Sequence, residues 1–383
     1  MVKQQQRMFL SISLLVICGF SELHAQRTKG DIAAQLNKIV SERFAATRCP
    51  GLSVVVALNN EIVFSSAQGK ADVEQGVALQ KASVHRLASL SKLITGTIIM
   101  DLVEQGKLEL DTSVKRYLPE LPQAYQSVTL RHLLDHQSGV RGYDNPMDLA
   151  FSVAHYPTSR DAMKTFMAFP LAFPPGTKTE YGSLSFTVAG AAAESATGRS
   201  FQEISRDFFV RHAISGFFLD DPLAIVPKRV RGYLVDSNSK IEFNDGRIVE
   251  REYLSGTAGA VTNARAYDIS NRYPAGGFAA SAEDLLRFVI KVSTGKVLGA
   301  EALHEMWMAQ PIADGTKGAF GIGWGVSQWQ GKVMVGMNGS EPSTTTFLRY
   351  FPDSGVGAAL LCNAEGVQGL PKLLDDILET AFH

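Results

Sequence analysis

The sequence predicts an α/β protein of the α+β kind. One antiparallel sheet is assembled from the two ends of the chain, is flanked by helices, and encloses an inserted, mostly helical region. Between about 86 and 273 the chain is largely helical in character and is punctuated by Gly and Pro. Apolar or β-branched runs typical of strands lie near both ends, at 53–58, 61–66, 332–337, 344–351 and 355–363.

The N-terminal strands are predicted to form a hairpin that follows a helix. A polar, helix-like stretch covers 31–46, and the runs 53–58 and 61–66 then flank Asn59 and Asn60. Asparagine tolerates positive φ, so two such residues between β-rich runs are typical of a two-residue hairpin turn.

The C-terminal strands end in a turn and a helix. The segment Pro352-Asp-Ser354 connects the last two strands. An amphipathic helix over 370–383 closes the chain. Its apolar stripe consists of Leu370, Leu373, Leu374, Ile377 and Leu378.

The segment 228–271 has the weakest pattern, and we interpret 232–235 with 241–243 as a small extra hairpin. No repeat or low-complexity linker divides the chain. We therefore expect a leader over 1–25 and one cooperative catalytic domain over 26–383. Its sheet region covers about 28–85 plus 300–383, and its inserted helical region covers about 86–299.

The first residues are typical of a signal peptide. Lys3 and Arg7 precede a 13-residue apolar stretch at 8–20, and Ala25 supplies a small residue for cleavage. At about 1.5 Å per residue this stretch cannot cross a bilayer core of about 30 Å. We expect export to the periplasm or the extracellular space, with no stable membrane span after cleavage. Lipid attachment at Cys18 and a retained anchor are the alternatives.

Composition favours a small-molecule or peptide substrate, including one derived from the cell wall. The formal net charge is −1, which gives no electrostatic reason to expect nucleic acid or an anionic membrane as a partner. Cys49 and Cys362 remain in the mature chain. They form either one disulfide or two buried free thiols.

The strongest chemical signal is Ser89-Leu-Ser-Lys92 at the start of an apolar helical run. Residues three apart share one helix face, about 5–6 Å between Cβ atoms. A serine hydroxyl is a poor nucleophile until a base takes its proton, and burial favours the neutral form in which lysine is a base. Alone, this spacing also fits a surface helix with Ser89 as its cap, but the helix that follows is too apolar for a surface position.

Tyr181 follows a loop set by Pro174-Pro-Gly-Thr177 and precedes another apolar helix. A phenol titrates near 10 in ordinary surroundings, so a catalytic tyrosine needs nearby positive charge, which Lys92 can supply. The alternative is a tyrosine that forms a structural hydrogen bond at a helix start.

Together these residues resemble the serine β-lactamase and penicillin-binding-protein superfamily, in its class C-like branch of esterases, D-aminopeptidases and small penicillin-binding proteins. Ser89-Leu-Ser-Lys92 is similar to the first family motif, and Tyr181-Gly-Ser183 lies where the family has Tyr-x-Asn. The resemblance covers essentially the whole mature chain and implies the β-lactamase/transpeptidase-like fold. Further segments that resemble family signatures are 102–111, 133–139 and 275–288.

Two positions depart from the family pattern. Ser183 replaces an asparagine, so the polar side chain at this position is shorter and lacks an amide donor. The third motif, Lys-Thr-Gly or His-x-Gly, reads Met337-Asn338-Gly339 here, and methionine cannot donate a charged hydrogen bond to a substrate carboxylate. The resemblance implies substrate contacts at Ser183 and at these three motif residues. It also implies an oxyanion hole made by the backbone N–H groups of Ser89 and Ser340.

The resemblance implies a serine hydrolase that forms an acyl-enzyme on an ester, amide or β-lactam carbonyl, and the leader at 1–25 implies that it is exported. Ser89, Lys92 and Tyr181 would be its catalytic residues, with no cofactor and no metal. The altered third motif supports a rival interpretation, a non-catalytic protein that binds cell-wall peptide or acts as a scaffold. His132 and His136 have the spacing of a metal pair, but no third ligand lies nearby in sequence, and we interpret both as structural.

The family fold also bears on the cysteines. If the first and last strands pair antiparallel, as this fold implies, the start of one meets the end of the other. That arrangement favours a disulfide between Cys49 and Cys362.

Overall fold

The computed structural model describes residues 28–142, 153–235, 240–242, 248–250, 261–264 and 266–383. The expected leader of residues 1–25 lies outside this part of the chain. Within it, no helix combines the length and the apolar character needed to cross a membrane.

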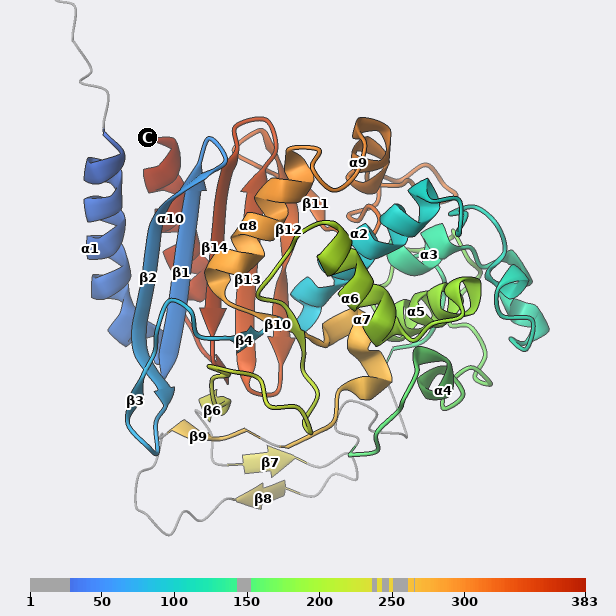
Figure 1. Ribbon diagram of the computed structural model, residues 1–383, viewed down its shortest axis with the longest axis horizontal. Helices are drawn as coiled ribbons and strands as arrows, with labels where there is room; N and C mark the ends of the chain where they lie inside the picture. The colour runs from blue at the N-terminus through green and yellow to red at the C-terminus, as the bar shows by residue number, and fades with distance from the viewer. Residues whose placement is uncertain (1–27, 143–152, 236–239, 243–247, 251–260, 265) are drawn as a thin grey trace, which may run out of the picture.

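Strands from both ends of the chain form one seven-stranded antiparallel sheet, which confirms the predicted fold class (Figure 1). Its order is β11-β12-β13-β14-β1-β2-β3. N-terminal β1 pairs with C-terminal β14, and Leu52 lies opposite Cys362. The strands are β1 (Gly51–Leu58), β2 (Glu61–Asp72), β3 (Val77–Ala78), β11 (Val326–Trp329), β12 (Lys332–Glu341), β13 (Thr344–Phe351) and β14 (Val356–Cys362).

The first hairpin forms as predicted. Asn59 and Asn60 adopt φ values of 50° and 64°, and β1 pairs with β2 on either side of them. Two consecutive residues with positive φ match the right-handed twist of the flanking strands. The two asparagines therefore specify this turn locally.

Helices cover both faces of the sheet. On one face lie α1 (Lys29–Thr47) and α10 (Leu370–Phe382), and on the other lies α8 (Ala282–Ser293) (Figure 1). All five residues of the predicted stripe on α10 are buried. Because both faces are covered, β1 is buried along its whole length: Val54 and Val56 pack toward α1 and α10, and Val55 packs toward the helical region.

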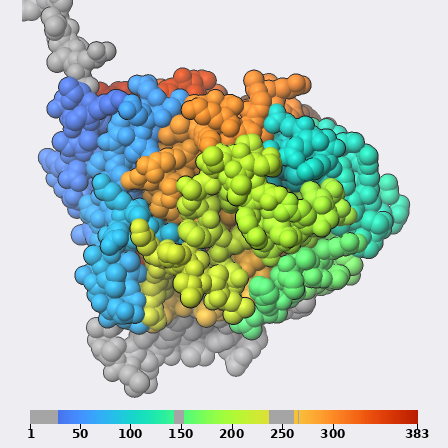
Figure 2. Space-filling view, viewed as in Figure 1, coloured from blue at the N-terminus to red at the C-terminus, as the bar shows by residue number. Residues whose placement is uncertain are grey.

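The helical region is built around a helix that is buried on all sides. The core of that region packs around α2 (Ser91–Glu104), which is buried from Ser91 to Leu102. Figure 2 shows α6 and α8 side by side on the outer face, where the Lys291 ammonium contacts the carbonyl of His212. The remaining helices include η1 (Ala88–Leu90), α3 (Leu130–Leu134), α4 (Ser159–Met163), α5 (Leu184–Thr197), α6 (Phe201–Arg211), α7 (Tyr273–Gly276) and α9 (Ala300–Met306).

The prediction that 232–235 and 241–243 form a small hairpin is wrong. Strand β6 (Tyr233–Val235) pairs instead with β9 (Val261–Asn263) and with β15 (Ala364–Glu365), which follows β14. β7 (Lys240–Glu242) pairs with β8 (Ile248–Glu250). Two side chains of β6 are buried in the core that also holds the cysteines, so burial against a distant part of the chain decided this pairing.

The disulfide between Cys49 and Cys362 is present, with the Cα atoms 6.0 Å apart. Both residues are buried in the core between the sheet and the pair α1 and α10. The β1–β14 register brings them together, because Cys49 lies just before β1 and Cys362 ends β14. The disulfide thus closes a loop across a sequence separation of 313.

Candidate active site

Ser89 lies in a tight turn that leads into the buried helix. The Leu90 N–H donates to the Leu87 carbonyl at 3.2 Å, which closes the turn η1, and Ser89 is 9% exposed. Ala88, just before Ser89, has φ of 49°, in the left-handed region that residues with a Cβ seldom occupy. Strain of this kind persists only where the surroundings impose it.

Lys92 is fully buried, and its ammonium is surrounded by acceptors. It donates to Ser89 Oγ at 3.3 Å, to Ser183 Oγ at 3.1 Å and to the Ala275 carbonyl at 3.1 Å. These three acceptors match the three N–H groups that an ammonium carries. Ser183, which we expected to contact substrate, thus holds the lysine, and it is only 8% exposed. The Ala275 carbonyl was not foreseen, since nothing marks a backbone oxygen in a sequence.

Tyr181 completes the cluster from the loop before α5. Its hydroxyl donates to Ser89 Oγ at 2.6 Å, and its side of the site is open, with 47% of the residue exposed. The ammonium of Lys92 lies 4.9 Å from the Tyr181 ring centroid and 5.4 Å from that of Phe186. A cation over aromatic faces in a water-poor site is stabilised by the ring quadrupoles.

His136 supports Tyr181 from behind, a contact that the sequence analysis missed. Its ring packs on Tyr181 with centroids 4.6 Å apart and on Phe320 at 4.5 Å. Its Nδ1 accepts the Gly182 N–H at 3.2 Å. Burial, and to a lesser extent the charge of Lys92, hold the pKa of His136 well below its ordinary value. The imidazole is therefore neutral and carries its proton on Nε2. The segment 133–139, which resembles a family signature and contains His136, was the feature of the sequence that pointed to this residue.

His132 and His136 do not lie on one helix face. α3 ends at Leu134, and His136 follows with φ of 66°. His132 Nδ1 accepts the Thr129 N–H at 3.4 Å, so each ring binds a different backbone amide. Within the described part of the chain, no group of three or more His, Cys, Asp or Glu is placed to hold a metal ion.

The altered third motif lies on β12 beside the nucleophile. Met337 and Gly339 are buried on the sheet face that looks toward the helical region, whereas Asn338 is exposed on the other face. Asn338 Oδ1 accepts a hydrogen bond from Arg349 at 2.7 Å. A Cβ on Gly339 would lie 2.8 Å from the Leu87 carbonyl, so glycine permits β12 to approach the turn that carries the nucleophile.

Ser340 presents its backbone to the free edge of β12. The Gly336 N–H donates to the Gly325 carbonyl at 3.1 Å, on the β11 side. N–H groups alternate in direction along a strand, and the register with β13 continues unshifted to Glu341. The Ser340 N–H therefore points to the same side as that of Gly336, beyond the end of β11. The last pair between β11 and β12 is Val326 with Val335, so this N–H lies outside that pairing.

These features define a serine hydrolase: a serine bonded to a tyrosine and a buried lysine, at a helix start and beside an open strand edge. The beta-lactamase family model matches residues 36–382, and the chain belongs to this family. It is an enzyme of the serine hydrolase class.

Several relatives match most of this chain. Esterase EstB from Burkholderia gladioli is 29% identical over an alignment of 316 residues that covers 77% of this chain and 78% of that protein. The mitochondrial serine beta-lactamase-like protein LACTB of Homo sapiens is 23% identical and covers 83% of this chain and 74% of its own length. The D-amino acid amidase of Ochrobactrum anthropi SV3 shares the fold, with a TM-score of 0.73 at 19% identity over 92% of this chain and 98% of that one.

Proposed function

We propose that this enzyme hydrolyses a carboxylic ester or amide through an acyl-enzyme on Ser89. The observation that carries the proposal is that Ser89 Oγ accepts hydrogen bonds from both Tyr181 and Lys92. A hydroxyl placed between a tyrosine and an ammonium is oriented for attack, and it can transfer its proton to the tyrosine when that residue is ionised. Ser91, the other serine of the motif, is fully buried and accepts the Phe278 N–H instead.

In the proposed mechanism, Tyr181 reacts as the phenolate. Ser89 Oγ attacks the carbonyl carbon while its proton passes to the phenolate oxygen of Tyr181. The ammonium of Lys92 stabilises the negative charge that Tyr181 and then Ser89 carry during the transfer. The N–H groups of Ser89 and Ser340 stabilise the oxyanion, and the proton then moves to the leaving oxygen or nitrogen as its bond to carbon breaks. Water attacks the resulting ester of Ser89 along the same path and restores the hydroxyl.

The chemistry around the third motif favours neutral acyl donors. Met337 lies in the apolar core cluster beside the strand edge, where a thioether and methyl group replace a charged donor. Esterase EstB, the relative with 29% identity, is an esterase by name. We therefore rank ester or amide hydrolysis first, action on D-peptides second, and β-lactam hydrolysis third.

Export is part of the proposal. The basic and apolar start of the chain supports it, and the pairing of Cys49 with Cys362 suits an oxidising compartment. Small acyl compounds and cell-wall peptides are the substrates that such a location makes accessible.

The proposal is tested by labelling the purified enzyme with a fluorescent fluorophosphonate and with a penicillin. We expect a covalent adduct on the peptide that contains Ser89, located by mass spectrometry, and no adduct in Ser89→Ala. The absence of an adduct with every acylating probe would identify a non-catalytic binding protein instead.

Restoring a basic group at Met337 should change substrate preference. We expect Met337→Lys to raise kcat/KM for a penicillin or a D-Ala-D-Ala peptide by about ten- to a hundredfold, because a charge-assisted hydrogen bond contributes ~1.5–3 kcal/mol. Neutral esters should change little. Steady-state kinetics on both substrate classes measure the difference.

The matched control is Met334→Lys, on the same strand. Met334 packs toward the opposite core, between the sheet and the pair α1 and α10, so a lysine there cannot reach the substrate. Equal effects of Met337→Lys on both substrate classes, or no effect on either, would show that Met337 does not select the acyl donor.

A further inference from the structure

A buried ion pair joins the two segments that flank the nucleophile. Arg272 immediately precedes α7 and is fully buried, and its guanidinium donates to both Glu341 carboxylate oxygens, at 3.2 and 2.8 Å. Glu341 is the last residue of β12, and its side chain is 12% exposed. Two N–H···O bonds from one guanidinium fix orientation as well as distance. The pair therefore sets how α7 lies against the end of β12.

Both partners are close in sequence to groups of the proposed mechanism. Arg272 lies three residues before Ala275, whose carbonyl accepts from the catalytic lysine. Glu341 directly follows Ser340, the proposed oxyanion donor. A Cβ on Gly276 would lie 3.0 Å from Glu341 Oε1, so the carboxylate packs on the backbone of α7 itself. The pair thus connects the segment that anchors the lysine with the strand that carries the oxyanion donor.

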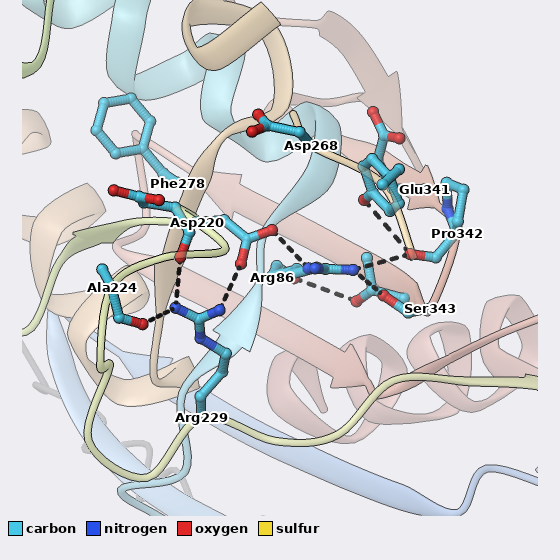
Figure 3. A network of polar contacts seen from close by, with 12 residues as sticks. Arg86, Asp220, Ala224, Arg229, Asp268, Phe278, Glu341, Pro342 and Ser343 are labelled. Carbon is cyan, nitrogen blue, oxygen red and sulfur yellow. Dashed lines mark hydrogen bonds and ion pairs between the residues drawn. The ribbon is translucent and has the colours of Figure 1, made fainter. Parts of the chain in front are cut away.

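A second arginine holds the turn after β12. Arg86 donates to Ser343 Oγ at 2.7 Å and pairs with Asp220 at 2.5 Å. Figure 3 shows its guanidinium between Asp220 and the turn, with Glu341 at the start of that turn. The Tyr267 ring centroid lies 4.9 Å from the Arg86 guanidinium and 5.4 Å from that of Arg272. The end of β12 is thus held on more than one side.

We propose that the Arg272–Glu341 pair is a positioning device for the oxyanion hole, an inference that rests on the proposed function. The pair fixes the Ser340 N–H relative to the Ala275 carbonyl that anchors the lysine. Buried ion pairs often stabilise a fold no better than apolar residues of the same volume. We expect the pair to act on the catalytic rate through geometry, because a misplacement of a catalytic group by about 1 Å costs roughly a hundredfold in rate.

Glu341→Gln and Arg272→Lys test the proposal in the full-length enzyme. Glu341→Gln removes the negative charge and keeps the shape of the side chain. Arg272→Lys keeps the positive charge and loses the two parallel N–H···O bonds that a guanidinium makes. We expect kcat for a neutral ester to fall by about a hundredfold in each variant, with KM little changed, since the lost interaction acts in the transition state.

A thionoester of the same substrate provides a readout specific to the oxyanion hole. Sulfur is a weak hydrogen-bond acceptor, so a well-placed pair of N–H donors discriminates strongly between the oxygen and sulfur compounds. The wild type should prefer the oxygen ester, and both variants should lose much of this preference.

The pair between Asp101 and Arg211 is the matched control. It also has two N–H···O bonds from one guanidinium, at 3.2 and 2.6 Å, although the Arg211 side chain is 44% exposed. The Asp101 carboxylate is buried, also contacts His212, and lies on α2, the helix that Ser89 precedes. Asp101→Asn and Arg211→Lys should lower the melting temperature and leave kcat and the oxygen preference unchanged.

The proposal is wrong if Glu341→Gln behaves like Asp101→Asn, with a lower melting temperature and unchanged kcat and oxygen preference. Should Glu341→Gln not fold, Arg272→Lys decides by the same two readouts. A failure of the proposed function is distinguishable, because the wild type itself would then form no adduct on Ser89.

Discussion

Ser89→Ala should abolish turnover of every ester substrate, with kcat lower by about 10⁴- to 10⁶-fold. The change removes the nucleophile and leaves the core around α2 intact, so the melting temperature should hardly change. Lys92→Met should cause a comparable loss, because it keeps the buried stem and removes the ammonium that Ser89, Ser183 and Ala275 accept from. Initial rates and thermal unfolding measure the two effects separately.

Ser91→Ala is the control within the same motif. Ser91 is fully buried and its hydroxyl accepts the Phe278 N–H at 3.0 Å, so the change should lower stability by about 1–3 kcal/mol and leave catalysis intact. If Ser89→Ala retained the wild-type rate, the assignment of the nucleophile would be refuted.

Removing the disulfide should cause a large loss of stability. In the chain-entropy model, closing a loop across 313 residues restricts the unfolded chain and contributes about 6 kcal/mol. The double variant Cys49→Ala/Cys362→Ala should therefore unfold at a much lower guanidinium concentration. Activity at temperatures where it stays folded should be unchanged, because the cysteines lie on the sheet face away from Ser89.

Reduction gives an independent check. A reductant should lower the unfolding midpoint of the wild type to near that of the double variant, which itself should not respond. Two free thiols in non-reducing mass spectrometry of the purified protein would contradict the disulfide.

The local features of this protein could be predicted because each depends on residues a few positions apart. The spacing of Ser89 and Lys92, the Asn59-Asn60 turn and the apolar stripe of α10 are all of this kind. Periodicities of 3.6 and 2 residues and the tolerance of asparagine for positive φ act within a single element. For the same reason, the sheet built from both ends could be inferred from where strand-like runs occur.

Long-range pairing was predictable only where a rule of topology applied. The disulfide followed once the first and last strands were taken as neighbours. No rule of topology predicted a partner for β6. Its pairing was decided by burial against the segment after β14. β11 is a short edge strand with half of its residues exposed, so it lacked the apolar run that identifies a buried strand.

By itself the sequence determined the candidate nucleophile, its lysine and its tyrosine, because their order and spacing are readable along the chain. Only the tertiary structure decided what surrounds them. The Ala275 carbonyl lies 183 residues beyond Lys92, and His136 packs on Tyr181 from a turn 45 residues earlier. The bond between Arg272 and Glu341 likewise spans 69 residues. A backbone oxygen, a ring contact or an ion pair leaves no local pattern, since each is created when distant elements are buried against one another.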